Sequence, residues 1–357
     1  MAGFSRIGVA GEPVMQEGPS PIIGRPVELV CPAGNLPALK TAIDNGADAV
    51  YIGFRNNTNA RNFPGLNFSR DEAAKGIDYA RHAGKRVFLA LNTYPVPRLW
   101  DEAAASVDMA AAIGADALIL ADPGLLEYAS ATHPGLRLHL SVQGSATNRQ
   151  AIAFYRERFG IQRVVLPRVL SLEQVRRLVE KSGVEIEVFG YGGLCVMAEG
   201  RCALSSFVTA ESPNSAGVCS PAHAVRWHET AEGTDSYLND VLINTFRDDE
   251  AASYPTICKG RFKVNDHIYH AIEEPTCLNL LEILPDIQRA GISAIKVEGR
   301  QRSRAYVATV TRILRAALDA CNSDPESFRA RPDWIDQLNL LAEGSCHTLG
   351  AYHRPWQ

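Results

Sequence analysis

The sequence lacks any hydrophobic run that could cross a membrane and any excess of basic residues. None of its apolar stretches reaches the roughly eighteen residues that a transmembrane helix needs. Its first residues lack the basic segment followed by an apolar segment that marks a secretion signal, and we expect a cytoplasmic protein. Lys and Arg total 36 against 40 Asp and Glu in 357 residues, a net charge of −4. With no basic excess, nucleic acid is not the partner that composition predicts.

Motifs of several common enzyme classes are also missing. The chain has no Walker loop, no Gly-x-Ser-x-Gly elbow, no His-Glu-x-x-His and no Rossmann fingerprint, and its nine histidines are scattered. Neither a nucleophile–base pair nor a hydrolytic metal motif can be recognised. These absences speak against nucleotide-binding and hydrolytic chemistry.

A recurring pattern of helix, glycine and short apolar run predicts the fold. Residues 46–52 (GADAVYI) return as residues 114–120 (GADALIL), with weaker echoes at 160–166 and 291–297. The glycine is typical of a helix end, and the apolar run of a buried parallel strand. With the other candidate runs, eight strands are expected near residues 27, 49, 87, 117, 138, 163, 186 and 294. They predict a (β/α)8 TIM-like barrel, with an open doubly wound sheet as the alternative.

The spacing of these strands also predicts the domain organisation. Residues 1–24 are expected to form a flexible extension, and 25–194 the first seven βα units. About a hundred residues separate the last two strands, so residues 195–280 are interpreted as an insertion after the seventh strand. Residues 281–357 supply the last barrel unit and a tail. Loops that follow barrel strands lie at the catalytic face, so the insertion is expected to cap the active site.

Four of the eight cysteines are spaced as a candidate cluster site. They follow the pattern Cys195-x6-Cys202-x16-Cys219-x38-Cys258, with glycines nearby. In a reducing compartment metal ligation gains weight over disulfides. Zinc usually shows Cys-x-x-Cys pairs, which are absent. From spacing alone, the interpretation as an iron–sulfur cluster site and the interpretation as four inert buried thiols are about equally well supported. The remaining cysteines are assigned to core or surface: Cys31, Cys277, Cys321 and Cys346.

The segment around the first two of these cysteines resembles a known family. Residues 187–205 (EVFGYGGLCVMAEGRCALS) match the signature of the collagenase-like peptidases of unknown catalytic type. One departure is Gly193, where that signature has Ser or Ala. Residues 28–40, 58–61, 211–214, 258–261, 297–303 and 349–357 further resemble the ubiquinone-biosynthesis branch of the family.

The resemblance implies a cofactor, a reaction and partners. It implies that Cys195, Cys202, Cys219 and Cys258 bind a [4Fe–4S] cluster in an oxygen-independent hydroxylase that acts on a ubiquinone precursor. It also implies prephenate as the hydroxyl donor, a UbiV-like subunit in a heterodimer, and a UbiT-like lipid-binding protein in the same pathway. Three alternatives stay open: RNA hydroxylation, which relatives perform; a peptidase; and a binding module with a structural cluster.

Polar residues that follow predicted strands complete the candidate site. Barrel geometry is expected to point them into one pocket: Asn59, Arg61, Asn92, Asp122, Gln143, Asn148, Arg168, Glu298 and Arg300. Arginine binds carboxylates through two parallel hydrogen bonds, and prephenate carries two carboxylates. Five residues are therefore proposed to bind substrate: Asn59, Arg61, Arg168, Glu298 and Arg300. Structural salt bridges explain each arginine about equally well, and no catalytic residue is assigned.

Overall fold

The structure is a computed structural model that describes most of the chain. The described residues are 26–197, 199, 201–213, 218–231, 233–250 and 252–353. The extension expected at residues 1–24 lies outside them, as does the end of the chain from residue 354.

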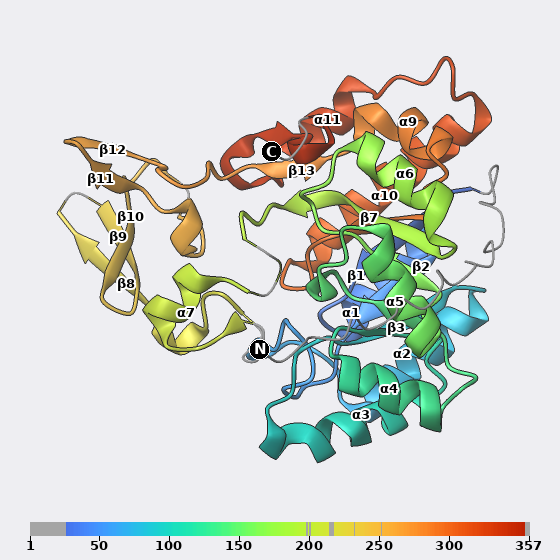
Figure 1. Ribbon diagram of the computed structural model, residues 1–357. Helices are drawn as coiled ribbons and strands as arrows, with labels where there is room; N and C mark the ends of the chain where they lie inside the picture. Colours follow the sequence, from blue (N-terminus) through green and yellow to red (C-terminus); the bar gives the residue numbers. More distant parts are fainter. Residues whose placement is uncertain are drawn as a thin grey trace, which may run out of the picture.

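Eight parallel strands close into a barrel, which confirms the predicted fold (Figure 1). Strand β14 pairs in parallel with both β1 and β7, so the sheet has no open end among these eight strands. An open doubly wound sheet is therefore excluded. The barrel strands are β1 (Glu28–Pro32), β2 (Ala49–Ile52), β3 (Arg86–Leu91), β4 (Ala117–Leu120), β5 (Leu138–Leu140), β6 (Arg163–Val165), β7 (Glu185–Gly193) and β14 (Ala294–Val297).

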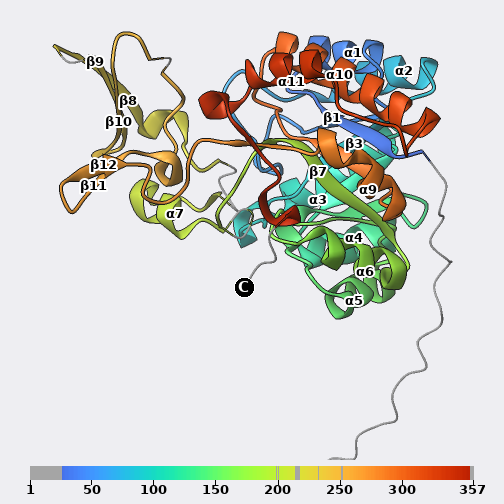
Figure 2. The same cartoon turned by 90° about the horizontal axis from the view of Figure 1, so that it is seen from above.

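Helices surround the barrel and bury their apolar faces against it (Figure 2). They are α1 (Leu36–Asp44), α2 (Arg70–His82), α3 (Trp100–Ala112), α4 (Pro123–Thr132), α5 (Arg149–Phe159), α6 (Leu172–Ser182), α9 (Leu284–Arg289), α10 (Arg304–Ser323) and α11 (Pro332–Asn339). Two polar residues expected in the pocket begin helices instead. Asp122 accepts a hydrogen bond from the Leu125 amide at 2.9 Å, and Asn148 accepts one from the Ala151 amide at 2.9 Å. Their position directly before a helix makes them N-caps.

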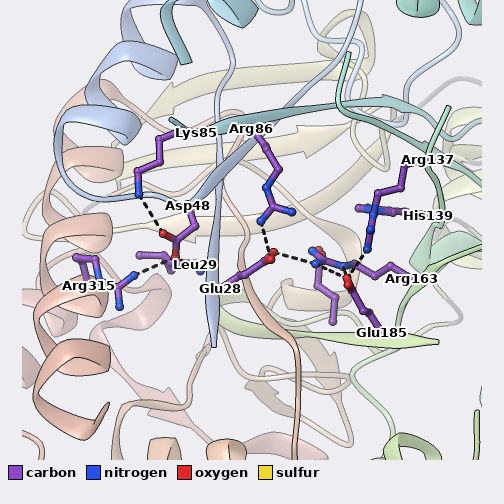
Figure 3. Close-up of polar contacts among 11 residues, drawn as sticks. Glu28, Leu29, Asp48, Lys85, Arg86, Arg137, His139, Arg163, Glu185 and Arg315 are labelled. Carbon is purple, nitrogen blue, oxygen red and sulfur yellow. Dashed lines mark hydrogen bonds and ion pairs between the residues drawn. The ribbon is translucent and has the colours of Figure 1, made fainter. Parts of the chain in front are cut away.

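The amino-terminal end of the barrel interior holds a network of charges (Figure 3). The Arg163 side chain is fully buried and donates to Glu28, Glu185 and Glu187 at 2.6–3.0 Å. Glu187 is also fully buried and accepts from Lys296 Nζ at 2.9 Å. In βα barrels this end of the strands serves stability, whereas active sites lie at the opposite end.

The long segment between β7 and β14 forms a lobe beside the barrel (Figures 1 and 2). It contains the short helix α7 (Ala203–Thr209), the antiparallel strands β8 (Val225–Thr230), β9 (Gly233–Leu238) and β10 (Val241–Phe246), and the hairpin β11 (Phe262–Val264) and β12 (His267–Tyr269). The lobe has a small apolar core of its own. The chain returns through β13 (Cys277–Asn279), which pairs antiparallel with the end of β7 and in parallel with β15 (His347–Thr348). No described helix has both the length and the apolar character to cross a membrane.

Candidate functional site

The four candidate ligand cysteines come from separate loops where the lobe meets the carboxyl end of β7. Cys195 follows β7, and Cys202 is the N-cap of α7, where its sulfur accepts from the Ser205 amide at 3.3 Å. The Ser205 hydroxyl donates to the Cys219 carbonyl at 2.5 Å and so ties the second cysteine segment to the third. Cys258 lies in a short 3-10 turn, Ile257–Lys259. All eight cysteines are free thiols, which leaves these four available as ligands.

The thiols lie near enough to influence one another's ionisation. The pKa of Cys195 is raised to about 11, mainly by burial and also by the nearby Glu199 and Cys219. Burial likewise raises the pKa of Cys258 to about 12, with contributions from Cys219 and Cys195. Desolvation raises the pKa of Cys219, Arg61 lowers it, and Cys202 raises it. Cys219 is thus electrostatically coupled to each of the other three.

The four cysteines supply the type of donor that a four-thiolate centre needs, and they lie on neighbouring loops. A cation would favour the thiolate forms that burial, and to a lesser extent neighbouring negative charge, now disfavour. Within the described part of the chain, however, no three His, Cys, Asp or Glu side chains are placed so that they could hold a metal ion. The cysteines lie together without forming a ligand geometry.

Arg168 lies beside the first cysteine and already has partners. Its Nε lies 3.2 Å from Glu199 Oε1, its Nη1 donates to the Gly193 carbonyl, and its guanidinium stacks 3.9 Å from the centre of the Phe189 ring. These contacts join the loop after β6 to the end of β7 and the loop of Cys195. The geometry favours a role in positioning that loop.

Arg61 and Glu298 face one another across the barrel mouth. Arg61 Nε lies 4.0 Å from Glu298 Oε1, and Arg61 Nη1 donates to the Ala60 carbonyl at 2.8 Å. Partial burial lowers the pKa of Arg61, but Glu298 and then Cys219 outweigh it, so the pKa is raised. Arg61 therefore pairs with Glu298 and lies near enough to Cys219 for their charges to interact.

Arg300 has a buried guanidinium arm without a hydrogen-bond partner in the described part of the chain. Its side chain is buried, and its Nη2 donates to Asn59 Oδ1 at 3.1 Å. Its buried Nη1 has no hydrogen-bond partner among the described residues. Burial lowers the pKa of this guanidinium to about 10. A Cβ at Gly53 would lie 2.7 Å from Nη1, so a glycine at that position leaves room for this arm.

Two glycines of the signature segment have different structural roles. Gly192 has a φ of +129°, and a Cβ there would lie 2.6 Å from that of Glu298, so the close approach of β7 to Glu298 requires glycine. At Gly193 a Cβ would meet only ordinary contacts of 3.5 Å or more. The serine or alanine of the family signature would fit at this position.

Sequence patterns pointed to some of these residues and missed others. Asn92 accepts from the Ala60 amide at 3.0 Å, and the Gln143 carbonyl accepts from the Tyr94 hydroxyl at 3.2 Å, so both support loops at the barrel mouth. Glu199, the partner of Arg168, was missed although it lies within the signature segment. The ion pair between Lys259 and Glu343 was also missed, because no local pattern joins residues so far apart in the chain.

Comparison with known proteins places the chain in a family. The sequence profile of Peptidase family U32 matches residues 34–355. tRNA hydroxylation protein P1 of Bacillus subtilis (strain 168) is 32% identical over 326 residues, 90% of this chain and 70% of that protein. 23S rRNA 5-hydroxycytidine C2501 synthase of Escherichia coli (strain K12) is 30% identical over 298 residues, 82% of this chain and 39% of that protein. The structure of the U32 peptidase Mk0906 aligns at 17% identity with a TM-score of 0.41, covering 52% of this chain and 76% of that chain. The chain therefore belongs to peptidase family U32.

Proposed function

We propose that this chain is the iron–sulfur subunit of an oxygen-independent hydroxylase. The observation that carries the proposal is four free cysteines on neighbouring loops at the barrel mouth, with Cys219 near enough to the other three and to Arg61 for their charges to interact. A [4Fe–4S] cluster would be held by Cys195, Cys202, Cys219 and Cys258 and would supply redox chemistry there. Several relatives, including the two described above, are named for hydroxylation, and these names support a hydroxylation reaction.

The acceptor we propose is the ring of a ubiquinone precursor, which makes the chain UbiU-like. The resemblance of several separate segments to the ubiquinone-biosynthesis branch supports this substrate. Prephenate would serve as hydroxyl donor, with a UbiV-like subunit as partner and a UbiT-like lipid-binding protein in the same pathway. For the donor, the unpartnered Nη1 of Arg300 offers a buried guanidinium arm to a carboxylate. Leaving such a donor unsatisfied costs free energy, which a bound carboxylate would recover.

RNA is the second candidate acceptor, and the names of the relatives favour it. The matched proteins of Bacillus subtilis and Escherichia coli are named for hydroxylation of tRNA and 23S rRNA. The chain spans 70% of the first and 39% of the second. A match over the shared region therefore does not show that this chain acts on the same substrates. Peptidase activity ranks below both, because the sequence has no recognisable nucleophile–base or hydrolytic metal motif.

The cofactor is tested by anaerobic purification. We expect a brown protein with about four irons and four sulfides per chain, which air bleaches. A colourless protein that holds stoichiometric zinc after anaerobic reconstitution would refute the cluster.

The acceptor is tested by deleting the gene and growing the cells without oxygen. Quinones and hydroxylated nucleosides are then both quantified by mass spectrometry in the same cultures. Loss of ubiquinone with unchanged RNA supports the proposal. Loss of a hydroxylated nucleoside with unchanged quinones establishes RNA as the acceptor instead.

A further inference from the structure

One ion pair joins the lobe to the barrel beside a candidate ligand. It links Lys259, the residue directly after Cys258, to Glu343 in the 3-10 turn Glu343–Ser345. The Lys259 ammonium is near enough to the Cys258 thiol for their charges to interact. Only 12% of the Lys259 side chain is exposed, so little water or salt screens its charge. A positive charge therefore acts on this candidate ligand from inside the protein.

The same ion pair lies against the end of β7, two residues before Cys195. A Cβ at Gly193 would lie 3.5 Å from Glu343 Oε1 and 3.8 Å from Lys259 Nζ, so both charges lie close to this backbone. Gly193 pairs with Cys277 on β13, and the Cys277 sulfur accepts from the Glu343 amide at 3.2 Å. The backbone that carries the carboxylate is thus anchored on the barrel side. The ammonium is held between the segments of two candidate ligands.

Other charges lie around this ion pair. Arg302 lies 3.5 Å from Glu343 Oε1, so the carboxylate keeps a second cation when Lys259 is replaced. Glu273 donates its amide to the Cys258 carbonyl at 3.1 Å, and it is near enough to Lys259 for their charges to interact. Of the two cations Lys259 is the more buried, with 12% of its side chain exposed against 37% for Arg302. Replacing Lys259 therefore changes the charge beside the cysteines and leaves the other charged groups in place.

From this arrangement we propose that the Lys259 ammonium, held by Glu343, raises the reduction potential of the cluster. The inference rests on the proposed function and deepens it, because it names a residue that regulates the same site. The potential of an iron–sulfur cluster depends on the charges around it. One electron taken up from a low-potential reductant adds a negative charge to the cluster and its thiolates. A nearby ammonium stabilises that reduced form, and a nearby carboxylate destabilises it. The two members of the ion pair thus act on the potential with opposite signs.

A redox titration of anaerobically reconstituted full-length protein tests the proposal. Dithionite is the reductant, and electron paramagnetic resonance follows the reduced cluster. Lys259→Met should make reduction about tenfold less favourable, a fall of about 59 mV for a one-electron couple. Glu343→Gln should raise the potential, because Lys259 then loses its counter-charge. The matched control is Lys263→Met, since Lys263 pairs with Asp266 on the surface of the same lobe with 65% of its side chain exposed; its potential should equal that of wild type.

Two further variants separate an electrostatic role from a structural one. Lys259→Glu combined with Glu343→Lys keeps an ion pair but reverses its direction, so the potential should fall at least as far as in Lys259→Met. Lys259→Arg keeps the charge and should keep the wild-type potential. A wild-type potential in both Lys259→Met and the charge-swapped variant would overturn the proposal. So would loss of iron in both, because the ion pair would then serve only to hold the lobe.

The iron and sulfide content of the wild-type protein keeps this test apart from that of the proposed function. A wild-type protein without a four-iron cluster would refute the proposed function and this inference with it. A four-iron cluster whose potential does not change when Lys259 is replaced would refute this inference alone.

Discussion

Replacing Arg163 by methionine should destabilise the barrel without touching the candidate site. The substitution keeps much of the side-chain volume and removes a fully buried charge that donates to Glu28, Glu185 and Glu187. Breaking a buried ion pair by removing one partner costs about 3–5 kcal/mol. The charges that remain determine where in this range the cost falls.

Each of the three carboxylates keeps another cation after Arg163 is removed. Arg86 lies 2.5 Å from Glu28, Arg137 lies 2.6 Å from Glu185, and Lys296 lies 2.9 Å from Glu187. Three cations then face three carboxylates, so we expect a loss of about 3 kcal/mol, the lower end of the range. Glu187→Met is the opposite case, because Arg163 and Lys296 both lose a fully buried carboxylate. It should cost about 5 kcal/mol.

The assay is urea unfolding followed by tryptophan fluorescence under anaerobic conditions, with thermal midpoints from calorimetry. At roughly 2–4 °C per kcal/mol, Arg163→Met should lower the midpoint by about 6 °C or more. Arg177→Met serves as the matched control, because Arg177 pairs with Glu173 on the surface of α6 with 67% of its side chain exposed; its effect should stay within about 0.5 kcal/mol. The double substitution at 163 and 187 should cost less than the sum of the two. A larger loss for Arg163→Met than for Glu187→Met would refute this account of the charges.

Three further predictions concern the cysteines, the arginines and pH. Alanine at Cys195, Cys202, Cys219 or Cys258 should abolish iron binding, measured by iron and sulfide analysis, while Cys321→Ala keeps the wild-type content; full iron in two of the four variants would contradict the ligand set. Arg300→Lys should lower hydroxylation and leave the iron content normal, because lysine lacks the forked donors. Arg168→Lys should instead lower the iron content by loosening the loop of Cys195. Equal iron loss in both variants would show that Arg300 is structural. Burial raises the pKa of Glu187, but Lys296 and Arg163 outweigh it, so the folded-state pKa is lowered from 4.5; the stability from this carboxylate is therefore present above pH 4.5 and lost as pH falls below it. Thermal midpoints should fall less steeply below that pH in Glu187→Gln than in wild type, and parallel curves would show that Glu187 does not contribute.

The sequence by itself determined the barrel and the candidate cysteines. Most of the strands are short apolar runs that follow a glycine at the end of a helix, and such signals are local, so eight strands could be placed and joined into a closed sheet. The spacing of the four candidate ligands can likewise be read directly from the sequence: Cys195, Cys202, Cys219 and Cys258. The prediction was wrong at Asp122 and Asn148. A polar residue between a strand and a helix can either line the pocket or cap the helix, and these two cap helices.

Only the tertiary structure decided what the arginines contact and where a cavity forms. Arg168 and Arg300 look alike in sequence, since each follows a strand. The fold gives the first a carboxylate and a carbonyl, and leaves one arm of the second without a partner among the described residues. One cavity at the barrel mouth is lined by Thr58, Thr93 and Glu211, and the lobe brings Glu211 there from far along the chain. Partners and cavities depend on which distant segments meet, and no short-range pattern encodes that.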